Sequence, residues 1–266
     1  DSSEITTSTY YVSNSGDDST TNGTDSAAPY KTIRAAVSAA KSGDTIKLLS
    51  DINSSESKIE IKEKSIILDL NGKTLNTSGK NRIEVAESGS LTITDSSDTI
   101  GKIEHAADSS GNSAIKVCGT DGKTASLTLN KCILISEYKE NDKVTGGYGI
   151  FASNYSEVIC GSESDAEDSN VSITSGASAI SGNGLMTSCD VTIYSGKYVS
   201  ETSAAIYFPS SDKLTVAGGE FTGKTGFDIR AGTVEIKDAK VTFCFINQVW
   251  KIFFHELFSL IYSCIN

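Results

Sequence analysis

Short runs of alternating apolar and polar residues recur along the chain, and in its last third they recur about every twenty residues. Period-two alternation predicts β-strands with one buried face. Four segments open with an apolar–x–apolar pair, and successive pairs start 20, 23 and 20 residues apart: Val171/Ile173, Val191/Ile193, Leu214/Val216 and Val234/Ile236. A unit of this size cannot bury its own apolar face and must stack on copies of itself. The pattern therefore predicts a β-solenoid.

The same repeats predict which side chains point inward. We expect the opening pairs of the last three repeats to stack in register as two apolar ladders. Five residues after the second member of each of these pairs comes a further inward candidate, namely Tyr198, Phe221 and Val241. Additional alternating runs, Ile206/Phe208 and Phe227/Ile229, lie between the repeats. The alternation places the remaining residues outside, among them Asp228, Arg230, Glu235 and Lys237.

Two long intervals interrupt this pitch. Leu91 and Leu127 are 36 residues apart, and Leu127 and Val171 are 44 residues apart. The extra residues must leave the coils as loops or form an additional coil. Three polar stretches suit such loops: 119–125, 137–147 and 161–170. Loops on a rigid scaffold often carry binding function, but solvated insertions are also well tolerated, and both interpretations stay open.

An amphipathic helix is predicted near the N-terminus. Its apolar residues fall at i, i+3, i+4 and i+7 and form one stripe: Ile33, Ala36, Val37 and Ala40. Thr32 suits the N-cap position, and Gly43-Asp44 ends the helix. A short strand at Tyr11-Val12 comes before it. Because an open solenoid exposes the strands of its first coil, we expect this helix to cover that coil as a cap.

The N-terminal motifs resemble those of a known family. The order YYVSNSGDD, AAPYKTI, AAVSAAKSGDTI and LDLNGKTL resembles the start of right-handed parallel β-helix proteins of the pectin-lyase-like superfamily. Later units, such as SLTITDSS (90–97) and the segment 213–243, are similar to repeats in large surface proteins of Gram-positive gut bacteria. The resemblance covers about residues 10–243. It implies three parallel sheets, an inward apolar ladder and an outward face of Ser, Thr, Asn and charged residues.

We therefore expect an all-β protein, a right-handed parallel β-helix of about eight or nine coils with an N-terminal capping helix. Residues 1–44 hold the first strand, a loop and the capping helix. Residues 45–243 form the β-helix, and residues 244–266 form an apolar C-terminal segment.

This C-terminal segment differs abruptly from the repeats. Residues 243–266 contain five of the nine phenylalanines, the only tryptophan and no glycine. A helix from about Gln248 would place Lys251, His255 and Ser259 on one stripe. Three alternatives stay open: a cap on the last coil, a helix in a membrane interface, or sequence foreign to the repeat protein. A membrane-spanning helix is disfavoured because the segment carries Lys251, His255 and Glu256.

Composition narrows the class of partner. The formal net charge of −11 and the lack of a basic stripe argue against nucleic acid. Two prolines, 23 glycines and many Ser, Thr, Asn and Asp residues are typical of secreted bacterial proteins. The chain begins at Asp1 without a methionine or an apolar leader, which favours a mature or trimmed form. We expect the protein to be secreted or displayed on the cell surface.

The cysteines do not match a zinc site. The chain has six of them, without CxxC spacing or neighbouring histidines: Cys118, Cys132, Cys160, Cys189, Cys244 and Cys264. Cys118 and Cys132 could form a disulfide between adjacent coils. Alternatively, the cysteines are small buried residues that fill the core.

Candidate catalytic chemistry is sparse. Polygalacturonase-like relatives carry Asn-Thr-Asp, paired aspartates, Gly-His-Gly and Arg-Ile-Lys, and none of these motifs occurs here in a predicted strand. Lyase-like relatives need calcium-binding acids beside an Arg or Lys that removes a proton. The chain has three arginines: Arg34, Arg82 and Arg230. Asp228 and Arg230, at i and i+2 of one strand, are the nearest candidates for a catalytic pair, and a solvated ion pair between coils is the alternative.

Three other features bear on function. His105 follows the predicted strand 101–104 in a polar loop, where an exposed lone histidine is a poor catalytic signal. The acidic stretch 161–170 is a candidate calcium site, although no calcium-binding repeat is present. Thr92 and Thr94 are spaced as in ice-binding solenoids, but the sequence suggests no recurrence from coil to coil, which argues against that function.

These observations favour a non-enzymatic extracellular or cell-surface β-helix module for adhesion, stalk formation or glycan contact. The alternative is a polysaccharide lyase or glycoside hydrolase that acts on acidic polysaccharide, with Asp228 and Arg230 as its candidate catalytic residues. The expected partner is a polysaccharide or a host or cell-surface glycan. No cofactor is implied apart from the candidate calcium site. Membrane contact would involve only the C-terminal segment.

Overall fold

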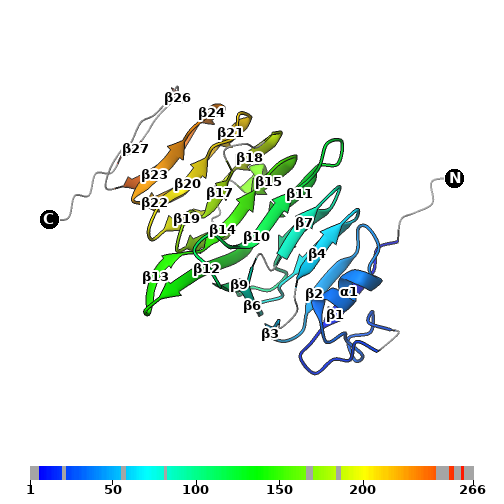
Figure 1. Ribbon diagram of the computed structural model, residues 1–266. Helices are drawn as coiled ribbons and strands as arrows, with labels where there is room; N and C mark the ends of the chain where they lie inside the picture. Colours follow the sequence, from blue (N-terminus) through cyan, green and yellow to red (C-terminus); the bar gives the residue numbers. More distant parts are fainter. Residues whose placement is uncertain are drawn as a thin grey trace.

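The computed structural model describes residues 6–19, 22–54, 58–80, 83–165, 170–183, 187–243, 252–254 and 259–260. Its strands form three long sheets in which consecutive strands of a sheet pair in parallel (Figure 1). Sheet A contains, in spatial order, β1 (Thr9–Val12), β2 (Thr45–Leu48), β5 (Ser65–Asp69), β8 (Ser90–Thr94), β11 (Ala125–Leu129), β15 (Ser156–Cys160), β18 (Cys189–Ile193), β21 (Lys213–Val216), β24 (Thr233–Ile236) and β26 (Ile252–Phe254).

Sheets B and C complete the wall of the solenoid. Sheet B contains β3 (Ile52–Asn53), β6 (Thr74–Gly79), β9 (Lys102–Ala107), β12 (Cys132–Glu140), β16 (Val171–Ser175), β19 (Lys197–Ser200), β22 (Glu220–Gly223), β25 (Lys240–Phe243) and β27 (Ser259–Leu260), with β13 (Lys143–Gly146) antiparallel to β12. Sheet C contains β4 (Ile59–Lys62), β7 (Ile83–Ala86), β10 (Ser113–Cys118), β14 (Tyr148–Ala152), β17 (Ile180–Gly182), β20 (Ala204–Phe208) and β23 (Thr225–Ile229).

The chain visits sheets A, B and C in turn, so each coil adds one strand to each sheet. Among the described residues, seven coils have a strand in all three sheets, from β2–β3–β4 to β21–β22–β23. Sheets A and B continue through β24–β25 and β26–β27. The prediction of an all-β parallel β-helix with about eight or nine coils is confirmed.

The apolar ladders lie where the repeats predict them. Val191, Leu214 and Val234 pair in register in sheet A, and Ile193, Val216 and Ile236 pair beside them. All six are at most 2% exposed. Tyr198, Phe221 and Val241 stack in the same way in sheet B and are also buried. The rings of Tyr198 and Phe221 stack with centroids 5.0 Å apart, which extends the core through the C-terminal coils.

The alignment of Val171 and Ile173 with these ladders is wrong. Both residues belong to β16 of sheet B, where Ile173 pairs with Leu134 and Tyr198. In sheet A the residue that pairs with Val191 on the side of the preceding coil is Val158. All three sheets bury every second residue, so alternation identifies a strand without identifying its sheet.

Coil length varies along the solenoid. In sheet A, Leu91 pairs with Leu127 after 36 residues, Leu127 with Val158 after 31, and Val158 with Val191 after 33. The next two coils need only 23 and 20 residues to reach Leu214 and then Val234. The long coils are therefore confined to the middle of the molecule.

The polar stretch 137–147 is mostly strand rather than the expected loop. It holds the end of β12 and all of β13, which form an antiparallel hairpin that projects from sheet B (Figure 1). Asn141 and Asp142 connect the two strands with φ values of 51° and 61°. Positive φ at both central residues matches a two-residue hairpin turn, which Asn and Asp adopt readily. Of stretch 161–170, residues 166–169 lie outside the described residues.

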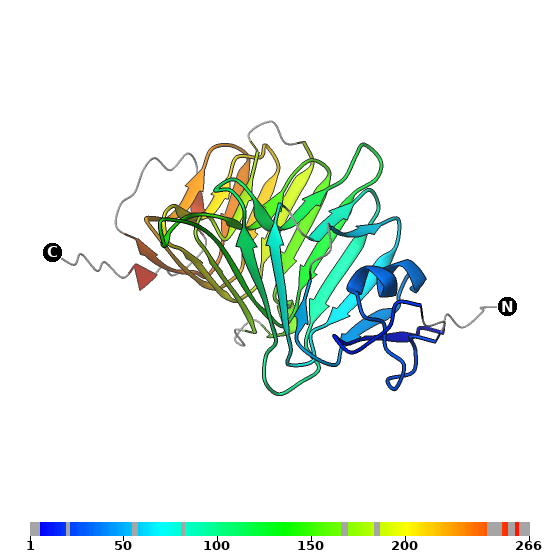
Figure 2. The ribbon, with the colours of Figure 1, turned by 60° about the horizontal axis from the view of Figure 1, so that its bottom comes forward.

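The capping helix is confirmed. α1 (Ile33–Ala39) begins after Thr32, whose side chain accepts a hydrogen bond from the Ala35 N–H at 3.2 Å. Its buried side chains, which include Ile33 and Val37, pack against β1, β2 and β4 at the N-terminal end of the solenoid (Figure 2). The Lys64 ammonium donates to two carbonyls near the C-terminus of α1, each at 2.9 Å, and so ties the helix to the coils.

The described parts of the C-terminal segment are strands. β26 pairs with β24 and β27 pairs with β25, so both continue existing sheets. At residues 252–254 and 259–260 the expected helix from about Gln248 is therefore wrong, and the rest of 244–266 lies outside the described residues. No helix in the described part of the chain is long and apolar enough to cross a membrane.

The four described cysteines are free thiols. The proposed Cys118–Cys132 disulfide is not formed, because Cys118 lies in sheet C and Cys132 in sheet B. Burial raises the pKa of the Cys160 thiol to about 12 and that of Cys189 to about 11. These thiols therefore stay protonated and unreactive at neutral pH, as core-filling residues do. Cys244 and Cys264 lie outside the described residues.

Threonines do recur on the outside of sheet A, contrary to the expectation from the sequence. Thr92 pairs with Thr128, and Thr192 pairs with Thr215. They belong to one outward column of β-branched residues: Thr45, Ile67, Thr92, Thr128, Ile159, Thr192 and Thr215. Two isoleucines interrupt the hydroxyl groups, so the column is best understood as packing between β-branched neighbours on adjacent strands.

Candidate functional site

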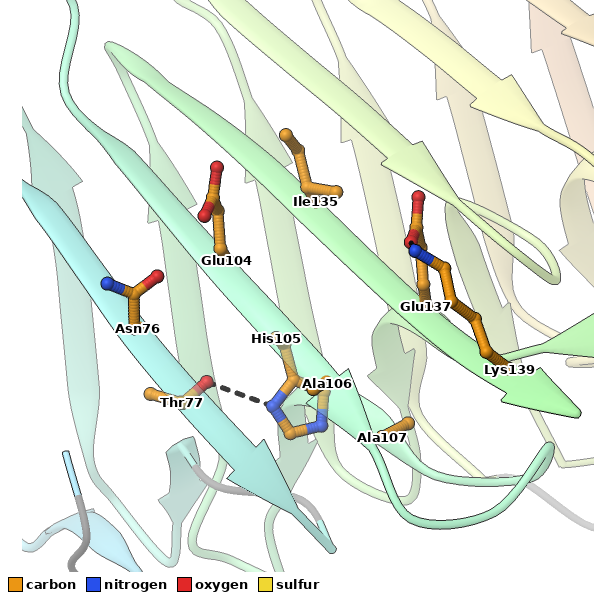
Figure 3. Close-up of a pocket in the computed structure, with 9 residues that line it drawn as sticks. All are labelled: Asn76, Thr77, Glu104, His105, Ala106, Ala107, Ile135, Glu137 and Lys139. Atoms are coloured by element: carbon orange, nitrogen blue, oxygen red, sulfur yellow. Dashed lines mark hydrogen bonds and ion pairs between the residues drawn. The ribbon is translucent and has the colours of Figure 1, made fainter. Parts of the chain in front are cut away.

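A groove of about 620 Å³ lies on sheet B where β6, β9 and β12 run side by side (Figure 3). Its walls carry carboxylate, ammonium, amide and methyl groups. The lining residues are Asn76, Thr77, Glu104, His105, Ala106, Ala107, Ile135, Glu137 and Lys139.

Long strands create this groove. β6 and β9 have six residues and β12 has nine, whereas β19, β22 and β25 of the same sheet have four. The register places Asn76, Glu104 and Ile135 in one outward row and Ala106 beside Glu137 in the next. Figure 3 shows Glu104, Ile135 and Glu137 on the same face of the sheet. The small Ala106 side chain keeps the floor low, while β12 continues into the hairpin and raises one wall.

The hairpin is fixed at its base by close backbone packing. Gly147 has a φ of +93° and donates its N–H to the carbonyl of Ser110 at 3.0 Å. A Cβ at Gly176 would overlap the carbonyl oxygen of Gly146. The base of the hairpin is therefore held between a loop of the previous coil and a turn of the next, and only glycine fits at position 176.

Each carboxylate of the groove is paired with a lysine of its own strand. The Glu104 carboxylate lies 2.6 Å from the Lys102 ammonium, and the Glu137 carboxylate lies 2.7 Å from the Lys139 ammonium. The hydrogen bond and charge of Glu137 raise the pKa of Lys139 above its usual value. The groove thus presents oriented acceptors and donors with little net charge, which suits hydrogen bonding to a neutral polar ligand.

His105 was expected in an exposed polar loop, and this expectation is wrong. The residue lies within β9, only 3% exposed, and its Nδ1 is 2.9 Å from the Thr77 hydroxyl (Figure 3). Alternation along β9 places its ring on the opposite side of the strand from Glu104. The strand extends three residues beyond the predicted Glu104, to Ala107, and so carries His105 into the wall of the solenoid. His105 is therefore among the residues around the groove, but alternation directs its imidazole toward the inner side of the sheet.

His105 belongs to a buried polar column inside sheet B. The register pairs Thr77 with His105, His105 with Ser136, Ser136 with Ser175, and Ser175 with Ser200. All five residues are at most 4% exposed. The Ser175 hydroxyl donates to the carbonyl of Ala177 at 2.7 Å, and its oxygen lies 3.2 Å from the carbonyl of Val199. The column is therefore an internal feature of the wall.

Asp228 lies in β23 of sheet C, whereas Arg230 directly follows the end of that strand, so the two candidates do not share one strand as expected. Neither lines the groove. Arg230 donates from Nε to Asp228 Oδ1 at 2.8 Å and from a terminal nitrogen to Oδ2 at 2.9 Å. The pair is bidentate and lies within one coil, so the expectation of an ion pair between coils is wrong. Arg34 lies on α1, and Arg82 is outside the described residues.

Buried aspartates hold the corners between sheets A and B. Asp95 Oδ2 accepts hydrogen bonds from the N–H groups of Gly72 and Gly101, each at 2.8 Å. Asp69 Oδ1 accepts from the N–H groups of Asn71 and Ser96, each at 2.9 Å. Both carboxylates are 5% exposed and join successive coils. Within the described ranges, no three His, Cys, Asp or Glu side chains come together as a metal site would require.

The sequence pattern marks part of the groove: Glu137 and Lys139 fall in the stretch 137–147, a candidate binding loop, whereas Glu104 is not marked. Glu104, Glu137 and Lys139 occur in ordinary polar positions, and only the parallel register brings them together. The signals in the sequence that this coil departs from the others are the long interval after Leu127 and the polar stretch 137–147.

Comparison with family models, with curated proteins and with solved structures gives no match for this chain.

Proposed function

We propose that this chain is a non-enzymatic parallel β-helix module, secreted or displayed on a cell surface, that contacts a glycan through the groove on β6, β9 and β12. The groove itself carries the proposal. It combines paired carboxylates and ammonium groups with the methyl groups of Ala106, Ala107 and Ile135. A sugar has hydroxyl groups at its rim and C–H groups on its faces, so it needs this combination of polar and apolar contacts.

The arrangement of charges supports binding rather than catalysis. Hydrolysis of a glycosidic bond requires one carboxyl group that carries a transferable proton. The carboxylates of Glu104 and Glu137 are each engaged in an ion pair, with lysine ammonium groups 2.6 Å and 2.7 Å away. The only described histidine near the groove turns its ring inward. A lyase or hydrolase for acidic polysaccharides is the alternative, and the formal charge of −11 would repel such a substrate.

We further propose that the chain belongs with right-handed β-helices of the pectin-lyase-like type. The N-terminal motifs and the helix-capped parallel solenoid support this assignment. A calcium ion at the acidic stretch 161–170 stays a proposal, since part of this stretch lies outside the described residues. Glycan contact is proposed to serve adhesion or to anchor a stalk.

A glycan array probed with the whole chain tests the function. We expect binding to a neutral glycan, with Glu104→Gln and Glu137→Gln each weakening it about tenfold, as loss of a charged hydrogen-bond partner does. The matched control is Glu220→Gln, which removes an ion-paired carboxylate from the same sheet outside the groove. Control and parent should bind alike.

Two results would contradict the proposal. One is full binding by both groove variants. The other is release of ultraviolet-absorbing unsaturated product from pectate, alginate or a glycosaminoglycan, with or without calcium. Loss of that release in Asp228→Ala or Arg230→Ala would place the activity on sheet C.

A further inference from the structure

A second outward feature lies on sheet C, whose strands run side by side along the solenoid from β4 to β23 (Figure 1). Lys116 pairs with Phe151, and Phe151 with Ser181. The pairing of Ile180 with Ile206 places Tyr207 beside Ser181, and Tyr207 pairs with Asp228. Five successive coils thus contribute one outward column: Lys116, Phe151, Ser181, Tyr207 and Asp228.

Two aromatic rings face outward in this column. Phe151 and Tyr207 are half-buried, whereas their neighbours Ile150, Ile206 and Phe208 point inward and are at most 2% exposed. A solvent-facing position on a sheet gives a phenylalanine no core to pack against, so its ring covers the sheet surface. Tyr148 packs against the Phe151 ring, with centroids 5.9 Å apart, and limits its movement.

The spacing of the two rings is set by the solenoid. Adjacent strands of a sheet are about 4.8 Å apart, so Phe151 and Tyr207, two coils apart, are separated along the axis by roughly 10 Å. The small Ser181 lies between them, 3% exposed. In an extended β-1,4-linked glycan the same ring face recurs at every second sugar, and the length of one disaccharide is close to this separation. Two aromatic rings could therefore stack on alternate sugars.

Hydrogen-bonding groups lie beyond both rings. On one side, Glu84 lies 2.9 Å from the Lys58 ammonium and 3.5 Å from that of Lys116. On the other side is the bidentate pair of Asp228 and Arg230. The charges at each end are matched by opposite charges, so the column favours a neutral ligand over a charged one.

We propose that the outer face of sheet C binds a neutral, extended β-1,4-linked glycan that runs along the solenoid axis, with sugars stacked on Phe151 and Tyr207. The ion pairs at Glu84 and Asp228 contact hydroxyl groups at the two ends. This surface is separate from the groove on sheet B, and the proposal does not depend on the groove.

Calorimetric titration of the whole chain with cellohexaose and with chitohexaose tests this. We expect at least one of them to bind and α-linked maltohexaose, which does not extend in the same way, to fail to bind. Phe151→Ala and Tyr207→Ala should each weaken binding about tenfold, while Tyr207→Phe, which keeps the ring, should stay within about twofold of the parent.

Tyr194→Ala is the matched control, because Tyr194 is a half-buried aromatic outside sheet C, beside Thr192 of sheet A. Thermal melting verifies that the sheet C variants remain folded. Glu220→Gln, on sheet B outside both surfaces, should leave hexasaccharide binding unchanged. The proposal is overturned if neither β-linked hexasaccharide binds, if maltohexaose binds equally well, or if the two alanine variants of sheet C bind like Tyr194→Ala.

Discussion

The middle coils and the C-terminal coils are built on the same three sheets but use very different amounts of chain. From Leu91 to Val191 each coil takes between 31 and 36 residues, whereas the next two coils take 23 and 20. The short coils contain little beyond inward ladders and tight corners. The long coils add the hairpin and two of the three extended strands that form the groove, β9 and β12. Inward residues therefore maintain the scaffold, and the extra length supplies the site.

The largest loss of stability is expected from a core substitution in the short coils, where large side chains fill the core. Phe221 is completely buried and its ring contacts those of Tyr198 and Phe227, with centroids 5.0 Å and 4.6 Å away. Phe221→Ala should lower the free energy of unfolding by about 3–5 kcal/mol through loss of burial and a cavity. Urea denaturation measures it, with the outward Thr222→Ala as control. Equal urea midpoints for Phe221→Ala and Thr222→Ala would show that the aromatic stack contributes nothing to stability.

Disrupting the N-terminal cap should cause the second-largest loss of stability. Ile33 and Val37 are 2% and 7% exposed under α1. Ile33→Asp or Val37→Asp should destabilise the protein by on the order of 2–4 kcal/mol, because each places a charge in an apolar contact. Thermal and urea unfolding report the change, and Ser38→Asp on the exposed side of the helix is the control. A parent-like melt for Val37→Asp would mean that α1 does not cover the first coil.

The corner carboxylate of Asp69 predicts acid sensitivity. Burial opposes ionisation of Asp69, but hydrogen bonds from Ser96 and Asn71 and the Lys47 ammonium together hold its pKa below the usual value. A depressed folded-state pKa contributes stability above the unfolded value of about 3.9, and that stability is lost as pH falls through the folded value. Melting temperatures between pH 7 and pH 2 should fall less steeply for Asp69→Asn than for the parent. Asp98→Asn, at an exposed position, should follow the parent curve.

Shortening the hairpin should abolish glycan binding at the groove while leaving the stability of the solenoid almost unchanged. Replacing 139–145 with Asn-Gly joins Tyr138 to Gly146, which already pair across the two strands. Because side chains 139–143 are exposed, the free energy of unfolding should change by less than about 1 kcal/mol. Glycan binding at the groove should be lost with Lys139 and the raised wall. A large loss of stability would instead show that the long coil is part of the scaffold.

The smallest loss of stability is expected from removing an exposed ion pair on the outer face of the short coils. The Lys240 ammonium lies 2.8 Å from Glu220 of the preceding coil, and both side chains are about half exposed. Glu220→Gln should cost less than about 1 kcal/mol, and less still in high salt, since solvent and ions screen the pair. A double-mutant cycle with Lys240→Met measures the coupling. A coupling energy that is the same in 1 M salt as in low salt would show that the ion pair is not screened.

The sequence was sufficient for the parts of the fold that repeat. Inward alternation predicted the ladders of Val191 and Ile193, and the spacing of Ile33 and Val37 predicted the capping helix. It could not assign Val171 to the correct sheet, since alternation is the same in all three.

The groove could not be predicted in the same way. Glu104 and Glu137 are 33 positions apart in the sequence and become neighbours only through the pairing of β9 with β12. His105 was misplaced because nothing in GKIEHAA marks where the strand ends. The asymmetry is physical: burial imposes a pattern on inward residues, whereas a surface site depends on which coils happen to be adjacent.

The buried column from Thr77 to Ser200 constrains how neighbouring strands can slide. A shift of two residues along a strand keeps every inward residue inward, so the apolar pattern alone does not oppose it. In sheet B such a shift between β6 and β9 would break the 2.9 Å hydrogen bond between the buried Thr77 hydroxyl and His105 Nδ1, and it would place Thr77 opposite Ile103 or Ala107. The buried Thr77–His105 pair therefore favours the native alignment of β6 and β9 over one shifted by two residues, which the apolar residues alone would tolerate.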